Sequence, residues 1–186
     1  MTVVAIKTEA TIDDLYRVPE NGKAELVNGK IIRMSPTGAL PGYAGGEIFV
    51  GLRDFARRTR TGHAFPDNVG FVVNLPHRRS FSPDAAFYTG QMRGGQFLNG
   101  APVFTAEVRS EGDYGPVAER EMADKRADYF AAGTRVVWDV DVMRGMVVRV
   151  YRPDDPDHPT VYRRGETAEA EPAVPGWSLP VDDLFP

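Results

Sequence analysis

Two short segments rich in apolar residues lie on either side of a two-residue turn near the start of the chain. Short runs over residues 24–27 and 30–35 flank Asn28 and Gly29. The two central residues of a type I′ turn need positive φ angles, which Asn followed by Gly adopts at little cost. The pattern predicts an N-terminal β-hairpin.

Apolar residues with helical spacing follow over residues 43–60. Ile48, Leu52 and Phe55 are three or four positions apart, which places them on one face of an amphipathic helix. Gly62 comes next and is expected to end this helix.

Two further helices are predicted from their end signals. Thr11, with Asp14 three positions on, is typical of a capped first turn, and this short helix should stop before Pro19. Pro116 suits the first turn of a longer helix, which Gly133 should end.

Short apolar runs bounded by Gly, Pro, Asn and Ser predict β-strands along the rest of the chain. We expect strands at residues 70–75, 85–88, 103–108, 134–140, 146–151 and 160–162, with a turn region rich in Pro and Asp over residues 152–159. The run at 134–140 is so apolar that it should be buried on both faces. Strands and helices together predict a mixed α/β chain without internal repeats.

The composition is that of an ordinary globular protein, and the length of 186 residues fits a single domain over residues 1–186. Hydrophobic residues make up 42% and charged residues 26% of the chain, which argues against disorder. The formal net charge is -4, so any phosphate-binding surface must be local. The chain has no cysteine, which excludes disulfides, thiolate metal sites and a cysteine nucleophile.

The apolar stretches of the chain are short. The stretch within residues 1–10 is too short for the core of a signal peptide, and the others are strand-sized and interrupted by charge, far from the roughly 20 residues of a membrane helix. We therefore expect a soluble, cytoplasmic protein.

Several common active-site motifs are missing from the sequence. His63, His77 and His158 do not have metal-ligand spacing, which gives little support to a zinc site or a serine–histidine pair. The glycines form no phosphate-binding loop after a strand. Residues 77–79 make a local basic patch that suits phosphate contact without being specific for it.

Two acids at strand positions are the main chemical signal. Asp84 opens one predicted strand, and Glu107 lies inside the next. A carboxylate in a core strand loses hydration unless a cation compensates it. Two carboxylates, with a carbonyl and waters, suit Mg²⁺ or Mn²⁺. The alternative is that Glu107 points outward at an edge or pairs with Arg109 or Arg135.

Lys125 shares a helix face with Met122 and Tyr129, at offsets of three and four. Its stem could cross apolar packing while the ammonium group reaches a polar site, where it could stabilise a phosphorane or position a water. The alternative is a solvated lysine paired with Glu121 or Asp128, the commoner state of a helix lysine.

Glu47, on the first long helix, allows two interpretations that the sequence does not separate. It follows Gly45 and Gly46, and it could point toward Asp84 and Glu107. It could equally favour the helix N-terminus electrostatically.

The order of these segments along the chain is itself informative. The relevant residues are Ala24–Pro36, Pro83–Phe87, Ala106–Val108 with Ser110 and Asp113, Lys125 with Tyr129–Gly133, Val137–Trp138, Val150–Pro153 and Val174–Val181. In order and spacing, the chain resembles the Uma-two family of restriction endonucleases over nearly its whole length. That resemblance implies the PD-(D/E)XK nuclease superfamily, with a restriction-endonuclease-like core: a central mixed sheet flanked by helices.

The resemblance also implies roles for individual residues. Asp84 and Glu107 would be the two metal-binding acids. Arg109 stands where the superfamily has a lysine two residues after the second acid, and Lys125, on the following helix, matches the place to which this family moves that lysine. Glu47 resembles the acid on the first core helix.

Other positions are auxiliary or depart from the family pattern. Glu25 matches an acid of the hairpin region, and Asp113 and Arg109 are possible auxiliary residues. Residues 40–43 stand where many relatives have a histidine, and the usual Ser-Pro-Ser-Asp after the second acid reads Ser-Glu-Gly-Asp over residues 110–113. Neither departure removes a metal ligand.

The leading hypothesis is a Mg²⁺-dependent endonuclease that hydrolyses phosphodiester bonds of DNA. A homodimer is expected because cutting both strands of a duplex favours two sites related by two-fold symmetry. The main alternative is a nuclease-like module that binds nucleic acid or a protein without cutting. A β-rich protein for a small ligand is a weaker alternative.

Overall fold

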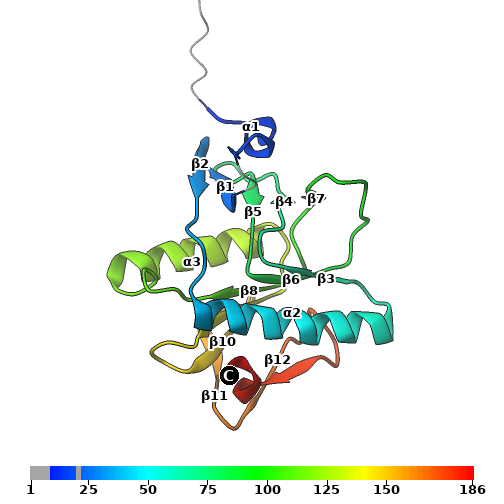
Figure 1. The fold of residues 1–186 in the computed structure, drawn as a ribbon, viewed down its shortest axis with the longest axis vertical. Coiled ribbons are helices and arrows are strands. Elements are labelled where there is room, and N and C mark those ends of the chain that lie inside the picture. Colours follow the sequence, from blue (N-terminus) through cyan, green and yellow to red (C-terminus); the bar gives the residue numbers. More distant parts are fainter. Residues whose placement is uncertain (1–8, 20–21) are drawn as a thin grey trace, which may run out of the picture.

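The protein is described by a computed structural model over residues 9–19 and 22–186. Most of the N-terminal stretch of residues 1–10 lies outside this part. At the centre is a mixed sheet with strand order β11-β10-β9-β8-β6-β3 (Figure 1). Its strands are β3 (His63–Pro66), β6 (Ala85–Tyr88), β8 (Phe104–Val108), β9 (Val136–Asp141), β10 (Val147–Arg152) and β11 (Asp155–Arg163). Within it, only β8 and β9 pair in parallel.

Helices and small sheets surround this central sheet. The helices are α1 (Ile12–Tyr16), α2 (Ala39–Thr59), α3 (Pro116–Ala131) and the 3-10 helix η2 (Val181–Leu184). The smaller sheets pair β1 (Ala24–Val27) with β2 (Lys30–Arg33), β4 (Phe71–Val72) with β5 (Ser80–Phe81) and β7 (Leu98–Asn99), and β12 (Thr167–Glu169) with β13 (Ser178–Pro180). The predicted hairpin at Asn28-Gly29 is thus confirmed, with both residues at positive φ.

Alternate residues of the central strands pack into two apolar clusters, one on each face of the sheet. On β6, Ala85 and Phe87 belong to the cluster that contains the buried face of α2 and the C-terminal elements. Ala86 and Tyr88 belong to the other cluster, which contains Tyr129 of α3. Because successive side chains of a strand point to opposite faces, the sheet is covered on both sides, as Figure 1 shows for α2 and α3. The predicted central mixed sheet flanked by helices is confirmed.

The ends of α2 differ from the prediction. The helix begins at Ala39 instead of Tyr43 because Pro41 is accommodated in its first turn. It ends at Thr59, and Arg60 takes the left-handed cap position with φ of 56°. Gly62 serves a different purpose. A Cβ there would lie 2.8 Å from the carbonyl oxygen of Tyr88, so a larger residue at this position could not lie as close to β6.

The predicted turn region over residues 152–159 is correct only at residues 153–154, which form the turn between β10 and β11. Strand β11 begins at Asp155 and pairs with β10, with a register shift between Val150 and Arg152. Its two prolines are tolerated because β11 is the edge strand of the sheet, where a missing N–H need not break a ladder on both sides.

Two other strand predictions were incomplete. The run at residues 70–75 forms a strand only at Phe71–Val72. Five strands were not predicted: β3, β5, β7, β12 and β13. The strand at residues 136–141 is buried along its whole length, as its apolar sequence predicted. In the described part of the chain, no helix is both long and apolar enough to cross a membrane.

Candidate active site

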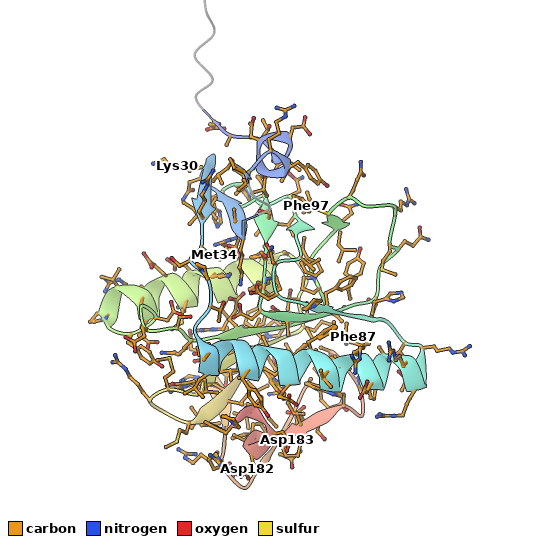
Figure 2. The ribbon with its side chains drawn as sticks, in the orientation of Figure 1. Lys30, Met34, Phe87, Phe97, Asp182 and Asp183 are labelled. Atoms are coloured by element: carbon orange, nitrogen blue, oxygen red, sulfur yellow. The ribbon has the colours of Figure 1, made fainter. Side chains whose placement is uncertain are left out.

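A cavity of about 480 Å³ lies between α3, the end of β8 and the segment that joins the hairpin to α2. Asp84, Glu107 and Lys125 all line it. Met34, labelled in Figure 2, lies on the segment leading from β2 to α2 and forms another part of the wall. The structure therefore brings together the two acids and the lysine that the sequence singled out.

Strand pairing places the two acids side by side. The strands β6 and β8 are antiparallel, and Ala85 pairs with Ala106, so Asp84 and Glu107 are opposite each other at the end of the two strands. The backbone N–H of Asp84 donates to the carbonyl of Ala106 at 3.1 Å. The N–H of Val108 donates to Oδ2 of Asp84 at 2.7 Å, which fixes the carboxylate at the cavity wall.

Glu107 is bound by two side chains of α3. Lys125 donates from Nζ to Oε2 at 2.9 Å, and the hydroxyl of Tyr129 donates to Oε1 at 2.6 Å. Burial raises the pKa of Glu107, and the neighbouring carboxylates of Asp84 and Glu25 add to this, whereas Lys125 opposes it. Glu107 thus has its ammonium partner from the next helix, and in the described part of the chain no hydrogen bond or ion pair joins it to Arg109 or Arg135.

Glu25, the hairpin acid, is buried behind Lys125. Its Oε1 lies 3.0 Å from Nζ of Lys125 and accepts the N–H of Ser82 at 2.9 Å. Arg78 donates to its Oε2 at 2.6 Å. Burial would raise the pKa of Glu25, but Lys125 and Arg78 outweigh it and the pKa is lowered. The carboxylate of Glu25 is therefore ionised, and it holds Lys125 in place.

Lys125 is mostly buried, with its ammonium between Glu107 and Glu25. Burial would lower its pKa, yet the two carboxylates raise it, so the group stays charged. Met122, Lys125 and Tyr129 all line the cavity, as their helical spacing predicted. No hydrogen bond or ion pair joins Lys125 to Glu121 or Asp128.

Sequence reasoning missed the role of two residues. Lys23, which precedes β1, places Nζ 2.6 Å from Oδ1 of Asp84 and lines the cavity. Tyr129 was noted only as a helix-face neighbour, yet it stacks on Phe81 with ring centroids 4.0 Å apart and orients Glu107. The lysine has no signal in the sequence, since it meets Asp84 only after the chain has folded.

Two proposed auxiliary residues line the cavity but are bound to partners other than Asp84 and Glu107. Arg109 lines the cavity, but its guanidinium makes two hydrogen bonds to Asp139 and further ones to Glu119. Asp113 also lines the cavity, and its Oδ2 accepts the N–H of Ser110 at 2.6 Å. Arg109 thus does not take the place of the lysine that the superfamily has at this position.

Glu47 is not brought to the cavity. It lies half-buried on α2 and is not among the described residues that form the cavity wall. Gly45, from the same helix, is the close neighbour of Asp84: a Cβ on it would lie 3.7 Å from Cβ of Asp84. The other interpretation, an acid that favours the helix N-terminus, is not supported either, because α2 begins at Ala39 and has no acidic residue in its first turn.

The basic patch at residues 77–79 is only partly available. Arg78 is buried between Glu25 and Asp128, with Nε 2.6 Å from Oδ2 of Asp128, so it cannot contact phosphate as expected. His77 is half exposed and its Nε2 lies 2.6 Å from Oδ1 of Asp128. Arg79 remains exposed.

The donor set at the cavity wall fits a hard divalent cation. Asp84 and Glu107 offer carboxylate oxygens side by side, as Mg²⁺ and Mn²⁺ require. Over the ranges 9–19 and 22–186, no group of three or more His, Cys, Asp or Glu is arranged to hold a metal ion. A site here therefore depends on two carboxylates, with backbone carbonyl and water oxygens as the other ligands.

These features define a restriction-endonuclease-like protein: a mixed sheet flanked by helices, with two acids at strand ends and a lysine beside them. The sequence matches the Uma2 family model, described as "Putative restriction endonuclease", over residues 11–182. The chain therefore belongs to the Uma2 family.

A solved structure supports the fold. The chain is similar to the crystal structure of "a putative nuclease belonging to DUF820" from Anabaena variabilis ATCC 29413, with a TM-score of 0.74 and 20% sequence identity. The match covers 94% of this chain and 97% of that one. A comparison with curated proteins found no match.

Proposed function

We propose that this protein is a Mg²⁺- or Mn²⁺-dependent endonuclease that hydrolyses phosphodiester bonds of DNA. The observation that carries the proposal is the contact of Lys125 with Glu107, beside Asp84, in a cavity open to a ligand. Lys125 of α3 would then take the role of the lysine whose position, just after β8, is occupied by Arg109. Family membership supports a nuclease.

Asp84 and Glu107 would hold the metal ion. When bound, a divalent ion would supply a Lewis acid and lower the pKa of a coordinated water. The backbone N–H of Val108 and the hydroxyl of Tyr129 keep the two carboxylates in position.

Lys125 is the residue that would act on the phosphate. Its ammonium stays charged because Glu25 and Glu107 raise its pKa. A fixed positive charge in a partly buried cavity stabilises negative charge that develops on phosphate oxygens in the transition state. Glu25 contacts Lys125 from behind and is therefore a positioning residue.

DNA as substrate, a homodimer and a single domain over residues 1–186 are part of the same proposal. A duplex cut on both strands favours two sites related by a two-fold axis. The cavity wall carries Lys23, Arg126 and Lys125, which are suited to phosphate but do not distinguish DNA from RNA.

Cleavage of plasmid DNA, with and without Mn²⁺ or Mg²⁺, tests the proposal. We expect metal-dependent cleavage by the wild type and none by Asp84→Asn or Glu107→Gln. Asp124→Asn, an exposed change on α3 outside the cavity, serves as the control and should cleave normally. Cleavage that persists in both acid variants would overturn the assignment.

Metal binding separates this function from the main alternative. Lys23 and Lys125 already neutralise Asp84 and Glu107 without any metal, as a module that only binds DNA would allow. Calorimetry with Mn²⁺ on the wild type and on Glu107→Ala distinguishes the two. Binding that is lost in the variant supports the nuclease, and DNA binding without any metal binding supports the module.

A further inference from the structure

The ammonium group of Lys23 lies between two carboxylates. Its Nζ is 2.6 Å from Oδ1 of Asp84 and 2.7 Å from Oδ1 of Asp67. The side chain is only 13% exposed. The carbonyl of Lys23 accepts the N–H of Met34 at 3.0 Å, so the base of the hairpin holds its backbone beside the cavity.

The two carboxylates that share Lys23 have different surroundings. The side chain of Asp84 is 13% exposed, lines the cavity and has its second oxygen bound by the N–H of Val108. The side chain of Asp67 is 44% exposed, follows β3 and is not part of the cavity wall. Lys23 therefore links an inner carboxylate, Asp84, to an outer one, Asp67. A small movement of its flexible side chain would break the contact with one of them and keep the contact with the other.

We propose that Lys23 is a positioning residue that pairs with both Asp84 and Asp67 in the absence of metal, and that it leaves Asp84 and keeps Asp67 when a divalent ion binds. The inference rests on the proposed function, because it takes Asp84 as a metal ligand. An ammonium group and a divalent ion both need Oδ1 of Asp84, and two cations at one carboxylate oxygen repel each other. Lys23 is thus an internal competitor that sets the metal affinity of the site.

This competition gives Asp67 a defined role. Once Asp84 binds a metal ion, Asp67 is the remaining carboxylate partner of Lys23, so it stabilises the metal-bound arrangement. Without Asp67, Asp84 is the only ion-pair partner of the ammonium among the described residues, and Lys23 competes more strongly with the metal. The two residues therefore have opposite effects on metal affinity.

Mn²⁺ calorimetry on the full chain, without DNA, tests the inference. Lys23→Met should raise the Mn²⁺ affinity about tenfold, the effect of removing one charge-assisted contact, and Lys23→Gln should raise it less. Asp67→Asn, which keeps an oxygen to accept the N–H of Asn68, should lower it. Lys30→Met, a change at an exposed residue of the hairpin (Figure 2), should leave it unchanged.

A double variant separates this exchange from a general electrostatic effect. If Asp67 acts through Lys23, Asp67→Asn has no effect on Mn²⁺ affinity in the Lys23→Met background. An equal loss of affinity in both backgrounds would overturn the exchange. Thermal unfolding without metal adds a second readout: Lys23→Met should lower Tm, because Asp84 loses its cation, and Mn²⁺ should then raise Tm by more than in the wild type.

The remaining outcomes distinguish the inference from the function. Mn²⁺ binding by the wild type that requires Asp84 but is not strengthened in Lys23→Met or Lys23→Gln overturns the inference and leaves the proposed function intact. No Mn²⁺ binding by the wild type or by either Lys23 variant overturns both. Mn²⁺ binding by the Lys23 variants but not by the wild type would support the inference, because Lys23 would then exclude the metal ion completely.

Discussion

The guanidinium of Arg109 lies against the carboxylate of Asp139, with Nε 2.6 Å from Oδ1 and Nη2 2.6 Å from Oδ2. Both side chains are buried, and Glu119 of α3 binds the same guanidinium. Burial would lower the pKa of Arg109, but Asp139 and Glu119 outweigh it and raise the pKa. The residue at the position of the usual lysine thus joins two strands and a helix.

Arg109→Met should therefore destabilise the protein without removing a reacting group. Loss of one member of a buried ion pair leaves Asp139 without its main partner, which costs about 3 kcal/mol. Urea unfolding followed by circular dichroism measures the change. Arg120→Met, an exposed change on α3, should cost far less, and equal losses in the two variants would contradict this role for Arg109.

Lys125→Met should reduce DNA cleavage about 10²-fold at saturating metal, because the fixed positive charge beside the phosphate is lost. The variant also leaves Glu25 and Glu107 without their shared cation, so its unfolding must be measured first. Lys30→Met is the matched control and should cleave normally. Full activity in a folded Lys125→Met protein would remove Lys125 from the site.

Tyr129→Phe isolates the hydroxyl that binds Glu107. The ring should keep its stacking on Phe81, so only one hydrogen bond to a carboxylate is removed. We expect a loss of about 1 to 2 kcal/mol in the free energy of unfolding, read from urea titrations. We also expect weaker Mn²⁺ binding in calorimetry, since Glu107 is less firmly oriented. Unchanged metal affinity would show that Lys125 alone is sufficient to orient it.

The pH dependence of the stability of the metal-free protein should reflect Glu107. Burial and the neighbouring acids raise its pKa above the ordinary 4.5, so the folded metal-free protein holds a proton there more tightly than the unfolded chain. The stability that this proton provides is lost as pH rises through the raised pKa. Glu107→Gln should therefore be more stable than the metal-free wild type at pH 7, and the difference should shrink in acid.

Metal binding needs the ionised form of Glu107. Mn²⁺ affinity should consequently begin to fall at a pH above 4.5, the ordinary value for glutamate, as the solution is made more acid. Calorimetry between about pH 4 and 8 would measure it. An affinity that stays constant down to pH 4.5 would contradict the raised pKa.

Local patterns in the sequence were enough to predict the elements that carry the site. Asn28-Gly29 specifies its turn within two residues, and the two acids were visible because charge is unusual in an apolar strand. The contact of Lys23 with Asp84 joins residues 61 positions apart and depends on how the hairpin packs beside β6. No local pattern encodes such a contact, so only the folded structure shows it.

The same reasoning explains the errors in the fold. The prolines of residues 152–159 indicated a turn because proline has no N–H to donate to the hydrogen bonds between strands. Whether a strand tolerates them depends on its place in the sheet, and β11 is at the edge. Likewise, Gly62 was predicted to end a helix. A glycine is needed there because a side chain would collide with β6, and that contact between distant segments is not visible in the sequence.

Asp141, at the end of β9, should make stability sensitive to strong acid. Its Oδ1 accepts the hydroxyl of Tyr114 at 2.8 Å and the N–H of Arg144 at 2.9 Å. Burial would raise the pKa of Asp141, but these hydrogen bonds outweigh it and lower the pKa below its usual 3.8. Burial and the same carboxylate raise the pKa of Tyr114 to about 12.

A lowered pKa means that the folded state favours the ionised form of Asp141. Its contribution is fully present above pH 3.8 and is lost as pH falls through the lower, folded-state pKa. Asp141→Asn should cost about 2 kcal/mol at pH 7, and the cost should decrease toward pH 2. Urea titrations across this range measure it, with the exposed Asp154→Asn as control. A cost that does not change with pH would mean that the charge of Asp141 contributes nothing.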